Sequence, residues 1–198
     1  MAAAESDGLR FREPARRLFA YEIERSNLLT REGEGTYARR YLWTPTGAKC
    51  NRIFFVGTLT DVSRVRDDMV RARVSDPTGS WSFFSGRFDR ETTDALSRME
   101  TPSLVALTAK VRSYESRGSE LVAFRPETVL SSTRAVRNRW ILDTAKQTEE
   151  RLSLLGGDPA LQRVREHYPG DLEPYRHAAK QALGAMAEGA EVEIVDLL

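Results

Sequence analysis

Residues 51–126 alternate apolar and polar side chains in five short runs, and one helical segment interrupts them after the third run. Alternation with a period of two places successive side chains on opposite faces of a strand, so each run predicts a strand with one buried face. Turn or breaker residues bound every run. The runs are Ile53–Thr60, Met69–Asp76, Trp81–Ser85, Leu104–Tyr114 and Glu120–Arg125.

Glycine and proline predict the turns between these runs. Asp76-Pro77-Thr78-Gly79 has proline at its second position and glycine at its fourth, which favours a type I β-turn and a hairpin. Arg117-Gly118 supplies the turn between the last two runs, and Pro126 is expected to end the fifth. Gly57, in the middle of the first run, predicts a bulge or tight bend of the kind that closes a small barrel.

One segment inside this region does not alternate. Arg87–Arg98 carries acidic residues early and fits a helix of about three turns, and Pro102 follows it. Three strands, a helix and two strands is the order of the OB fold, a five-stranded, partly open Greek-key barrel whose second and third strands present the binding face. We therefore expect a mainly β protein with helical extensions (α+β), in which a five-stranded OB-fold barrel is flanked by an N-terminal helix and a C-terminal helical region.

The segments before the barrel predict a helix and an arm. Glu13–Ile23 has apolar residues at helical spacing, and the polar link Asn27–Gly35 follows it. Tyr37–Arg52 mixes aromatic and basic residues, so it either clamps a phosphate backbone or covers the open end of the barrel. The predicted domains are 1–36 (N-terminal helix and linker), 37–130 (OB-fold nucleic-acid-binding domain), 131–187 (C-terminal helices) and 188–198 (acidic tail).

A long helix is predicted after the barrel, over Thr133–Leu155, and its apolar side must be buried against something. Two partners remain open, namely other subunits and the chain's own N-terminal helix. Gly156–Pro159 breaks this helix, and further helices are expected over Ala160–His167 and Tyr175–Ala187. The candidate subunit-interface residues on the apolar side are Val136, Trp140, Thr144 and Leu152.

Composition describes an ordinary soluble protein. The 198 residues are 30% charged with a net charge of +1, and the longest apolar runs are far shorter than the ~20 residues of a membrane helix. The first residues lack the hydrophobic core of a signal peptide. The single cysteine, Cys50, excludes an internal disulfide, fits a reducing cytoplasm and is expected to be buried.

Nothing in the sequence favours an enzyme. His167 and His177 lie in the helical tail, where we expect them to be solvated or hydrogen-bonded. The sequence has no Walker lysine loop, no Gly-x-Gly-x-x-Gly stretch, no cluster with metal-ligand spacing and no nucleophile elbow. We therefore predict no catalytic residue, no metal and no cofactor.

The basic residues of the strands share one parity. A net charge near zero weighs against a generic nucleic-acid binder, for which a basic domain is usual. However, acidic residues gather in the loops and in the predicted helix, while four cations lie opposite the Val and Leu positions of their strands. The sequence therefore predicts a locally positive sheet face, formed by Arg71, Arg73, Lys110 and Arg112.

The aromatic residues of the third strand divide between two faces. Trp81 and Phe83 share one parity and are expected inside, whereas Phe84 shares the other parity with small residues and is expected outside, with Phe88 next to it. Tyr114 lies on the same face as Lys110 and Arg112. Phe84, Phe88 and Tyr114 then form a candidate stacking platform for bases, beside cations that track phosphates. In the alternative, Phe84 and Phe88 pack under loops or against the arms.

Four stretches of the chain carry a resemblance to two known families. Residues 103–126, SLVALTAKVRSYESRGSELVAFRP, followed by a helix that contains Trp140, resemble the middle subunit of replication protein A. Pro45–Arg52, Val56–Thr60 and Asp76–Gly79 resemble the archaeal replication protein A-associated proteins more closely. This second likeness covers about residues 11–185.

The resemblance implies an OB-fold subunit of an archaeal replication protein A complex that binds single-stranded DNA in replication, repair and recombination. It implies DNA contacts at Tyr114 and at Phe84 or Phe88, although Gly86-Arg87-Phe88 stands where the family has a tryptophan at the exit of the third strand. It also implies other replication protein A subunits as partners, no membrane, and a cytoplasmic, nucleoid-associated location. The acidic end is a candidate docking tag for replication or repair proteins.

Two alternatives remain open. The missing tryptophan and the near-neutral charge favour an assembly subunit that makes little direct DNA contact. The chain is alternatively an RNA-binding OB module, because stacking faces read bases rather than sugars and no reader of the 2′-hydroxyl is evident.

Overall fold

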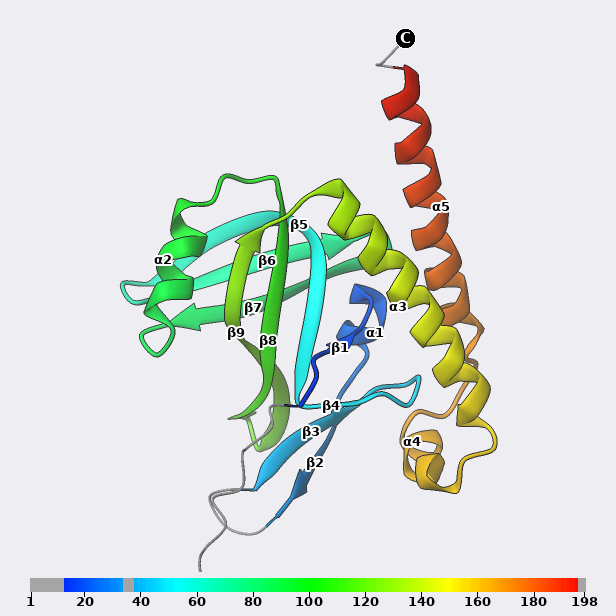
Figure 1. The fold of residues 1–198 in the computed structure, drawn as a ribbon. Helices are drawn as coiled ribbons and strands as arrows, with labels where there is room; N and C mark the ends of the chain where they lie inside the picture. The colour runs from blue at the N-terminus through cyan, green and yellow to red at the C-terminus, as the bar shows by residue number, and fades with distance from the viewer. Residues whose placement is uncertain (1–12, 34–37, 196–198) are drawn as a thin grey trace, which may run out of the picture.

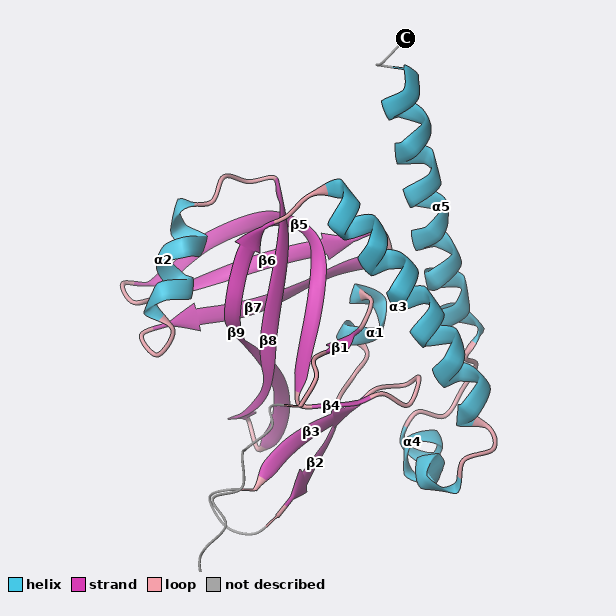
Figure 2. Ribbon diagram, in the orientation of Figure 1, coloured by secondary structure: helices cyan, strands magenta, loops and turns pink. Residues whose placement is uncertain are grey.

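The computed structural model describes residues 13–33 and 38–195, with side chains up to residue 186. One large sheet curls into a barrel, a small sheet lies below it, and helices cover one side (Figures 1 and 2). The large sheet has the strand order β7-β6-β5-β8-β9, and helix α2 separates β7 from β8 in sequence. These elements are β5 (Arg52–Arg66), β6 (Met69–Asp76), β7 (Gly79–Gly86), α2 (Arg90–Arg98), β8 (Ser103–Ser116) and β9 (Ser119–Ser131).

This order confirms the predicted OB fold and its five strands. β5 is shared by both halves of the barrel, because residues 52–59 pair with β8 and residues 58–66 pair with β6. The strand passes Gly57 at this crossover, where a Cβ atom would lie 2.2 Å from the carbonyl oxygen of Ser75. Only glycine fits there, because the neighbouring backbone approaches closely. The register shifts of β5 lie beyond the predicted position, between Leu59 and Asp61 and between Arg64 and Arg66. In the described part of the chain no ladder joins β7 to β9, which leaves an open seam between them.

The two predicted hairpin turns are present, but the predicted end of the last strand is wrong. Asp76 pairs with Gly79 across one turn, and Ser116 pairs with Ser119 across Arg117-Gly118. Arg117 and Gly118 have φ of 49° and 81°, the left-handed conformation that tight hairpins with a right-handed twist require. β9 does not stop at Pro126 but continues to Ser131. Pro126 is tolerated because it lies beside a register shift, where the ladder is already irregular.

A second sheet occupies the region predicted as a polar link and an arm. It consists of β2 (Leu28–Glu32), β3 (Arg39–Trp43) and β4 (Lys49–Cys50), in the order β2-β3-β4. β2 and β3 pair from Leu28 opposite Trp43 to Glu32 opposite Arg39, so the predicted domain boundary at 36/37 falls between two paired strands.

The helix predicted over 13–23 is mostly absent. Arg16 and Arg17 instead form β1 (Arg16–Arg17), which pairs in parallel with β5. Helix α1 covers only Ala20–Glu24, and the turn after β6 caps it: Asp76 Oδ2 accepts from the Ala20 amide at 2.8 Å, and Thr78 Oγ1 accepts from the Tyr21 amide at 3.1 Å. The sheet edge therefore takes the first part of the segment, and only one helical turn remains.

The C-terminal helices follow the prediction, except that the last one continues past Ala187 to Val195, into the predicted acidic tail. They are α3 (Arg134–Leu155), α4 (Gln162–His167) after a 3₁₀ turn at Pro159–Leu161, and α5 (Glu173–Val195). Thr133 caps α3 by accepting from the Val136 amide at 3.3 Å. α5 packs on α3, and its far end projects beyond the barrel (Figure 1). The predicted acidic tail, 188–198, lies outside the described side chains.

The apolar side of α3 is covered by this chain, which corrects the predicted subunit interface. Trp140, Thr144 and Leu152 are buried, and of the four predicted residues only Val136 is exposed, at 45%. The Trp140 ring packs edge-on against Phe55, and its Nε1 donates to the carbonyl oxygen of Phe54 at 3.0 Å. The barrel and the segment before it thus cover the apolar side of α3, for which the sequence left the partner open.

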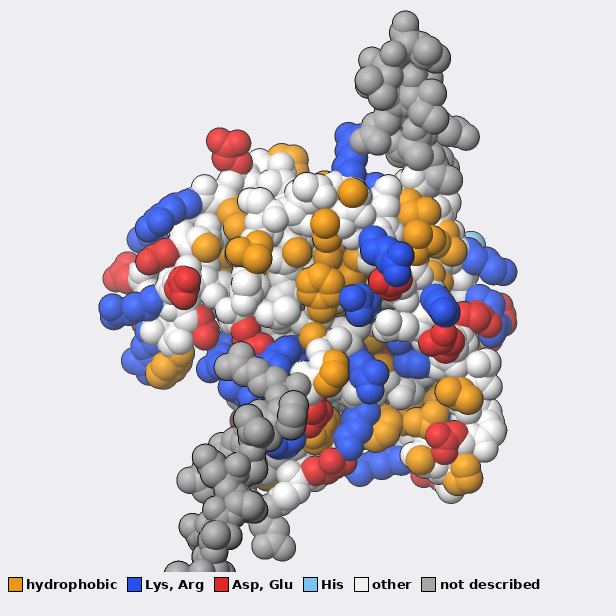
Figure 3. All heavy atoms as spheres, viewed as in Figure 1, with side chains coloured by type: hydrophobic (Ala, Val, Ile, Leu, Met, Phe, Trp, Pro, Cys, Tyr) orange, Lys and Arg blue, Asp and Glu red, His pale blue; other side chains and the backbone are white. Residues whose placement is uncertain are grey.

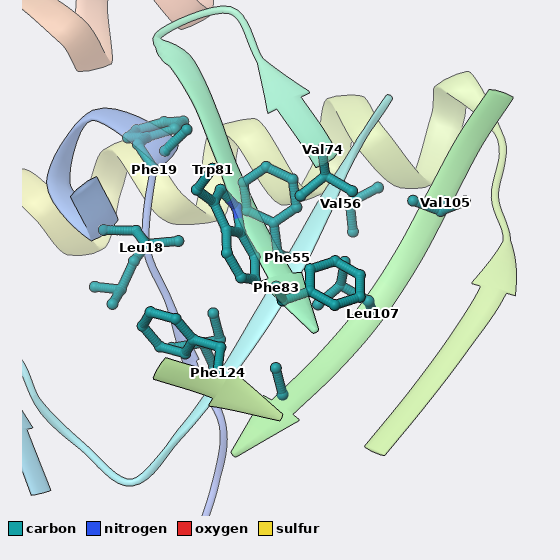
Figure 4. Packing of buried hydrophobic residues seen from close by; sticks show 14 of the residues in the cluster. Leu18, Phe19, Phe55, Val56, Val74, Trp81, Phe83, Val105, Leu107 and Phe124 are labelled. Carbon is teal, nitrogen blue, oxygen red and sulfur yellow. The ribbon is translucent and has the colours of Figure 1, made fainter. Parts of the chain in front are cut away.

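The core lies inside the barrel and against α3. Trp81 and Phe83 point inward from β7 toward Phe55 and Phe124 (Figure 4), and both are under 5% exposed, as the parity of the strand predicts. Cys50 is also buried, as expected, and burial raises the pKa of its thiol to about 12. Within the described residues, no helix is both long and apolar enough to cross a membrane.

A buried polar cluster, the Glu22–Arg151 junction, joins α1, the β3–β4 turn and α3. Glu22 is 2% exposed, and its carboxylate accepts from Arg151 Nη2 at 3.0 Å and from the Thr46 hydroxyl at 2.5 Å. Arg151 also donates to the hydroxyls of Thr46 and Thr148. Each charged group is thus paired, which is the condition for burying it without a large penalty.

Candidate nucleic-acid interface

The outer face of β6 and β7 carries two arginines and one exposed aromatic ring. Arg71 lies directly opposite Phe84, and Arg73 lies opposite Ser82. Arg71 Nη2 is 3.4 Å from the Ser82 hydroxyl, and Arg73 donates to the Ser80 hydroxyl at 2.7 Å. Among the described residues, neither arginine forms an ion pair with a carboxylate. Their charge is therefore available to an anion that lies along this face.

Phe84 and Tyr114 line one open hollow at the seam between β7 and β9. The two side chains are 48% and 51% exposed, although they come from strands on opposite sides of the seam. The hollow has a volume of about 280 Å³. Exposed rings beside cations are the arrangement on which bases of single strands stack. The structure thus brings together two of the three aromatic residues that the sequence placed on the outer face.

Besides Tyr114 of β8, three parts of the chain form the walls of the hollow. The β7 wall includes Ser82 beside Phe84, and the β9 wall includes Val122 and Ala123. The end of α1 and the residues after it form the third wall, with Ile23, Glu24 and Ser26. Because the β6–β7 turn caps α1, this third wall is fixed to the same hairpin that carries Phe84.

Phe88 lies apart from the hollow. It follows the end of β7, is 78% exposed, and does not line the hollow that Phe84 and Tyr114 share. The Arg87 guanidinium lies 4.8 Å from the centre of its ring. The structure therefore does not bring Phe88 into the hollow, and its role as a DNA contact stays a prediction.

Lys110 and Arg112 belong to a crowded basic cluster on the outer face of β8 and β9. Lys110 lies opposite Arg52 on one neighbouring strand and opposite Arg125 on the other. Arg52 pairs with Glu127, and Arg125 Nε is 3.5 Å from Asp89 Oδ1. These two carboxylates offset part of the positive charge, so the cluster is less positive than its cations alone suggest.

Burial and like charges act on the two predicted cations of this cluster. Partial burial lowers the pKa of Lys110, and the neighbouring Arg112 lowers it further. The pKa of Arg112 is lowered by partial burial and then by Arg125. A phosphate oxygen beside either side chain would relieve this repulsion. Arg112 also stands two residues before Tyr114 on the same face of β8, which links the cluster to the hollow.

The charge of the visible surface is mixed. Lys and Arg side chains alternate with Asp and Glu over the face shown in Figure 3, and hydrophobic side chains show around α3 and α5. This agrees with the net charge of +1. No single sign of charge dominates this view, and the locally positive sheet face stays a prediction.

Sequence reasoning missed part of this surface. Glu24 falls between the predicted helix and the polar link, where no role is expected, and Arg52 ends the predicted arm. Arg125 lies opposite Lys110, two residues before Glu127 on the last strand. The alternation of side chains along that strand was the signal that could have placed Arg125 on the same face as Lys110. The described residues contain no group of His, Cys, Asp and Glu that could hold a metal ion. His167 is hydrogen-bonded, because its Nε2 lies 2.8 Å from Asn27 Oδ1.

Neither a protein-family model nor a curated protein sequence matches this chain. A chain of a replication protein A heterotrimer bound to ssDNA shares 14% identity with a TM-score of 0.49, over 70% of this chain and 98% of that one. A chain of the S. pombe Stn1-ten1 complex shares 13% identity with a TM-score of 0.49, over 78% and 99%. The S. cerevisiae mitochondrial single-stranded DNA binding protein Rim1 shares 16% identity with a TM-score of 0.33, over 41% and 91%. The OB assignment itself rests on the strand order and register.

Proposed function

We propose that this chain is a single-stranded-DNA-binding OB-fold subunit of an archaeal replication protein A complex, and that it acts in DNA replication, repair and recombination. The resemblance of residues 103–126 and of the Asp76–Gly79 turn supports the family. The OB strand order supports the fold on which such binding is built.

One observation carries the binding role: Phe84 and Tyr114, from different strands, expose their rings in the same hollow. Stacking on such rings is worth ~1–3 kcal/mol per base and tolerates any sequence. Arg71 lies opposite Phe84 on β6, and Arg112 lies near Tyr114 on β8, so cations flank both rings. In this proposal the rings hold bases while Arg71, Arg73, Lys110 and Arg112 follow the phosphates.

The role is binding and not catalysis. The residues of the hollow supply aromatic rings, hydroxyls and one carboxylate, and no nucleophile with an adjacent base stands among them. We therefore propose no enzymatic activity and no cofactor. The protein acts by holding single strands and, with its partner subunits, by keeping them accessible.

One further observation favours an assembly role as the second candidate. Large apolar side chains are exposed where β9 leads into α3: Leu130 at 60%, Val136 at 45% and Leu142 at 46%. Such side chains are suited to a partner subunit. In this alternative the barrel and helices hold partners while the DNA contact is weak.

Fluorescence-anisotropy titrations of labelled oligo-dT and oligo-U separate these functions. The proposal predicts salt-dependent binding of oligo-dT by the chain alone, with a higher affinity when partner subunits are added. Binding that appears only with the partners would support the assembly role. Stronger binding of oligo-U than of oligo-dT would support an RNA-binding module instead.

A further inference from the structure

We propose that the hollow between β7 and β9 accepts one nucleobase that carries an amino group on its Watson–Crick edge, and that Glu24 reads that amino group. The inference rests on the proposed function, because it gives a base preference to the same surface. Stacking rings alone tolerate every base, so a preference needs a polar group beside them.

The size of the hollow fits one base. Its volume of about 280 Å³ is at the lower limit of the ~300–1,000 Å³ of pockets that hold drug-sized ligands. The Phe84 and Tyr114 rings are half exposed at its mouth, and Val122 and Phe124 contribute apolar surface. A planar ring can therefore enter between aromatic and aliphatic walls while the sugar and phosphate stay outside, toward the arginines.

Five of the lining side chains carry polar groups: Ser26, Ser82, Glu24, Tyr114 and Trp81, whose Nε1 is buried without a hydrogen-bond partner among the described residues. The Ser26 hydroxyl donates to the carbonyl oxygen of Glu22 at 2.7 Å. The Ser82 hydroxyl is 3.4 Å from Arg71 Nη2. Glu24 is the one carboxylate among the residues that line the hollow.

The Glu24 carboxylate is available as an acceptor. Its ion pair with Arg25 is long, at 3.9 Å, and both side chains are nearly half exposed. Such a pair contributes little and is easily rearranged. The guanidinium of Arg25 also stacks on the Tyr21 ring, 3.6 Å from its centre, and donates to the Tyr21 carbonyl, so it is held on α1 by other contacts.

The backbone holds Glu24 in place over β7. α1 is capped by Asp76 and Thr78 from the β6–β7 turn, which fixes the helix to that hairpin. A Cβ atom at Gly79, the first residue of β7, would lie 3.8 Å from Glu24 Oε2. The carboxylate therefore lies beside the first residue of β7, and Glu24 borders the hollow on that side.

A carboxylate accepts hydrogen bonds and donates none, so it distinguishes bases by their donors. Cytosine offers the N4 amino group, adenine offers N6, and guanine offers N1–H beside its N2 amino group. Thymine and uracil offer only N3–H, and the two carbonyl oxygens on either side of it repel a carboxylate. Glu24 therefore favours bases with an amino group over thymine and uracil.

The test compares two pyrimidine oligonucleotides of equal length, oligo-dC and oligo-dT, by anisotropy at one salt concentration. Because Glu24 is half exposed, we expect a preference for oligo-dC of about three- to tenfold, the lower part of the range for direct base contacts. Glu24→Gln should remove the preference, because the amide both donates and accepts. The matched control is Glu150→Gln, which removes the same charge from an exposed position on α3 and should keep the preference.

The dC/dT ratio is the decisive quantity, because removing a negative charge strengthens binding to both oligonucleotides equally. Equal affinity of the wild-type chain for the two would overturn this inference and leave the proposed function intact. A preference for oligo-dC that survives Glu24→Gln would overturn the assignment to Glu24. Absence of binding to either oligonucleotide, with or without partner subunits, would overturn the proposed function itself.

Discussion

Arginines occur in two contrasting settings in this molecule. In the Glu22–Arg151 junction, Arg151 donates to a carboxylate that is 2% exposed and to two threonine hydroxyls. On the outer face of β6, the side-chain partners of Arg71 and Arg73 among the described residues are serine hydroxyls of β7. In the first setting the arginine is paired with a carboxylate of the same chain. In the second setting the arginines can still pair with an anionic ligand. The partner of a cation, more than its presence, therefore separates a structural arginine from a binding one.

The aromatic residues repeat this contrast within one strand. Trp81 and Phe83 are under 5% exposed in the core, whereas Phe84, the next residue, is 48% exposed. Composition cannot distinguish these rings, but the alternation of the strand does. The three predictions that follow test the buried setting and then the exposed one.

The largest effect is expected for Trp140→Ala. The ring is buried against Phe55 and its Nε1 is hydrogen-bonded to Phe54, so its removal should lower the free energy of unfolding by ~3–5 kcal/mol. Urea denaturation measures this. The control is Val136→Ala on the same helix, at 45% exposure, which should change stability by less than ~1 kcal/mol. A Trp140→Ala protein of normal stability that loses its partner subunits on size exclusion would restore the subunit-interface role.

Arg151→Met tests the buried arginine. It leaves the Glu22 carboxylate buried without its cation, and breaking such a pair costs ~3 kcal/mol or more. The matched control is Arg139→Met on the same helix, whose side chain is 78% exposed and which should lose at most ~0.5 kcal/mol. Equal losses in the two variants, measured by thermal or urea unfolding, would show that the junction is not a structural ion pair.

Arg71→Gln tests the exposed setting and should have the smallest effect. Folding should be unchanged, and binding of oligo-dT should weaken modestly, because one phosphate contact is lost. The slope of log K against log salt concentration should become shallower by about 0.7. Arg139→Gln, on α3 in the part of the surface that Arg17 and Phe54 line, should leave the slope unaltered. An identical slope in the Arg71 variant would remove this residue from the DNA path.

The sequence was sufficient for the barrel and for the faces of its strands. Five alternating runs and one helix after the third predicted the OB succession of elements, and the parity of residues 81–84 correctly separated the core rings from Phe84. These features depend on local alternation and on turn residues, which a single sequence displays. The long helix was also predictable, because its cap at Thr133 and its break at Gly156 are local signals.

Other features depend on contacts between distant segments and had no local signal. The small sheet pairs residues 28–32 with 39–43, and the pairing of Arg16–Arg17 with β5 replaced a helix that the apolar spacing favoured. The hollow arises because β7 and β9 approach without pairing, and Glu24 reaches it only because α1 is capped by a turn more than fifty residues away. Burial of Trp140 inside its own chain likewise follows from tertiary packing.

The most direct test of the account is the binding of oligo-dT by Phe84→Ala and Tyr114→Ala, compared with Phe88→Ala. All three rings are about half or more exposed, so the substitutions should leave folding intact, and only the first two rings line the hollow. We predict that each of these two variants loses ~1–3 kcal/mol of binding free energy, and that Phe88→Ala loses less. Unchanged affinity in both Phe84→Ala and Tyr114→Ala would contradict the account and favour the assembly role.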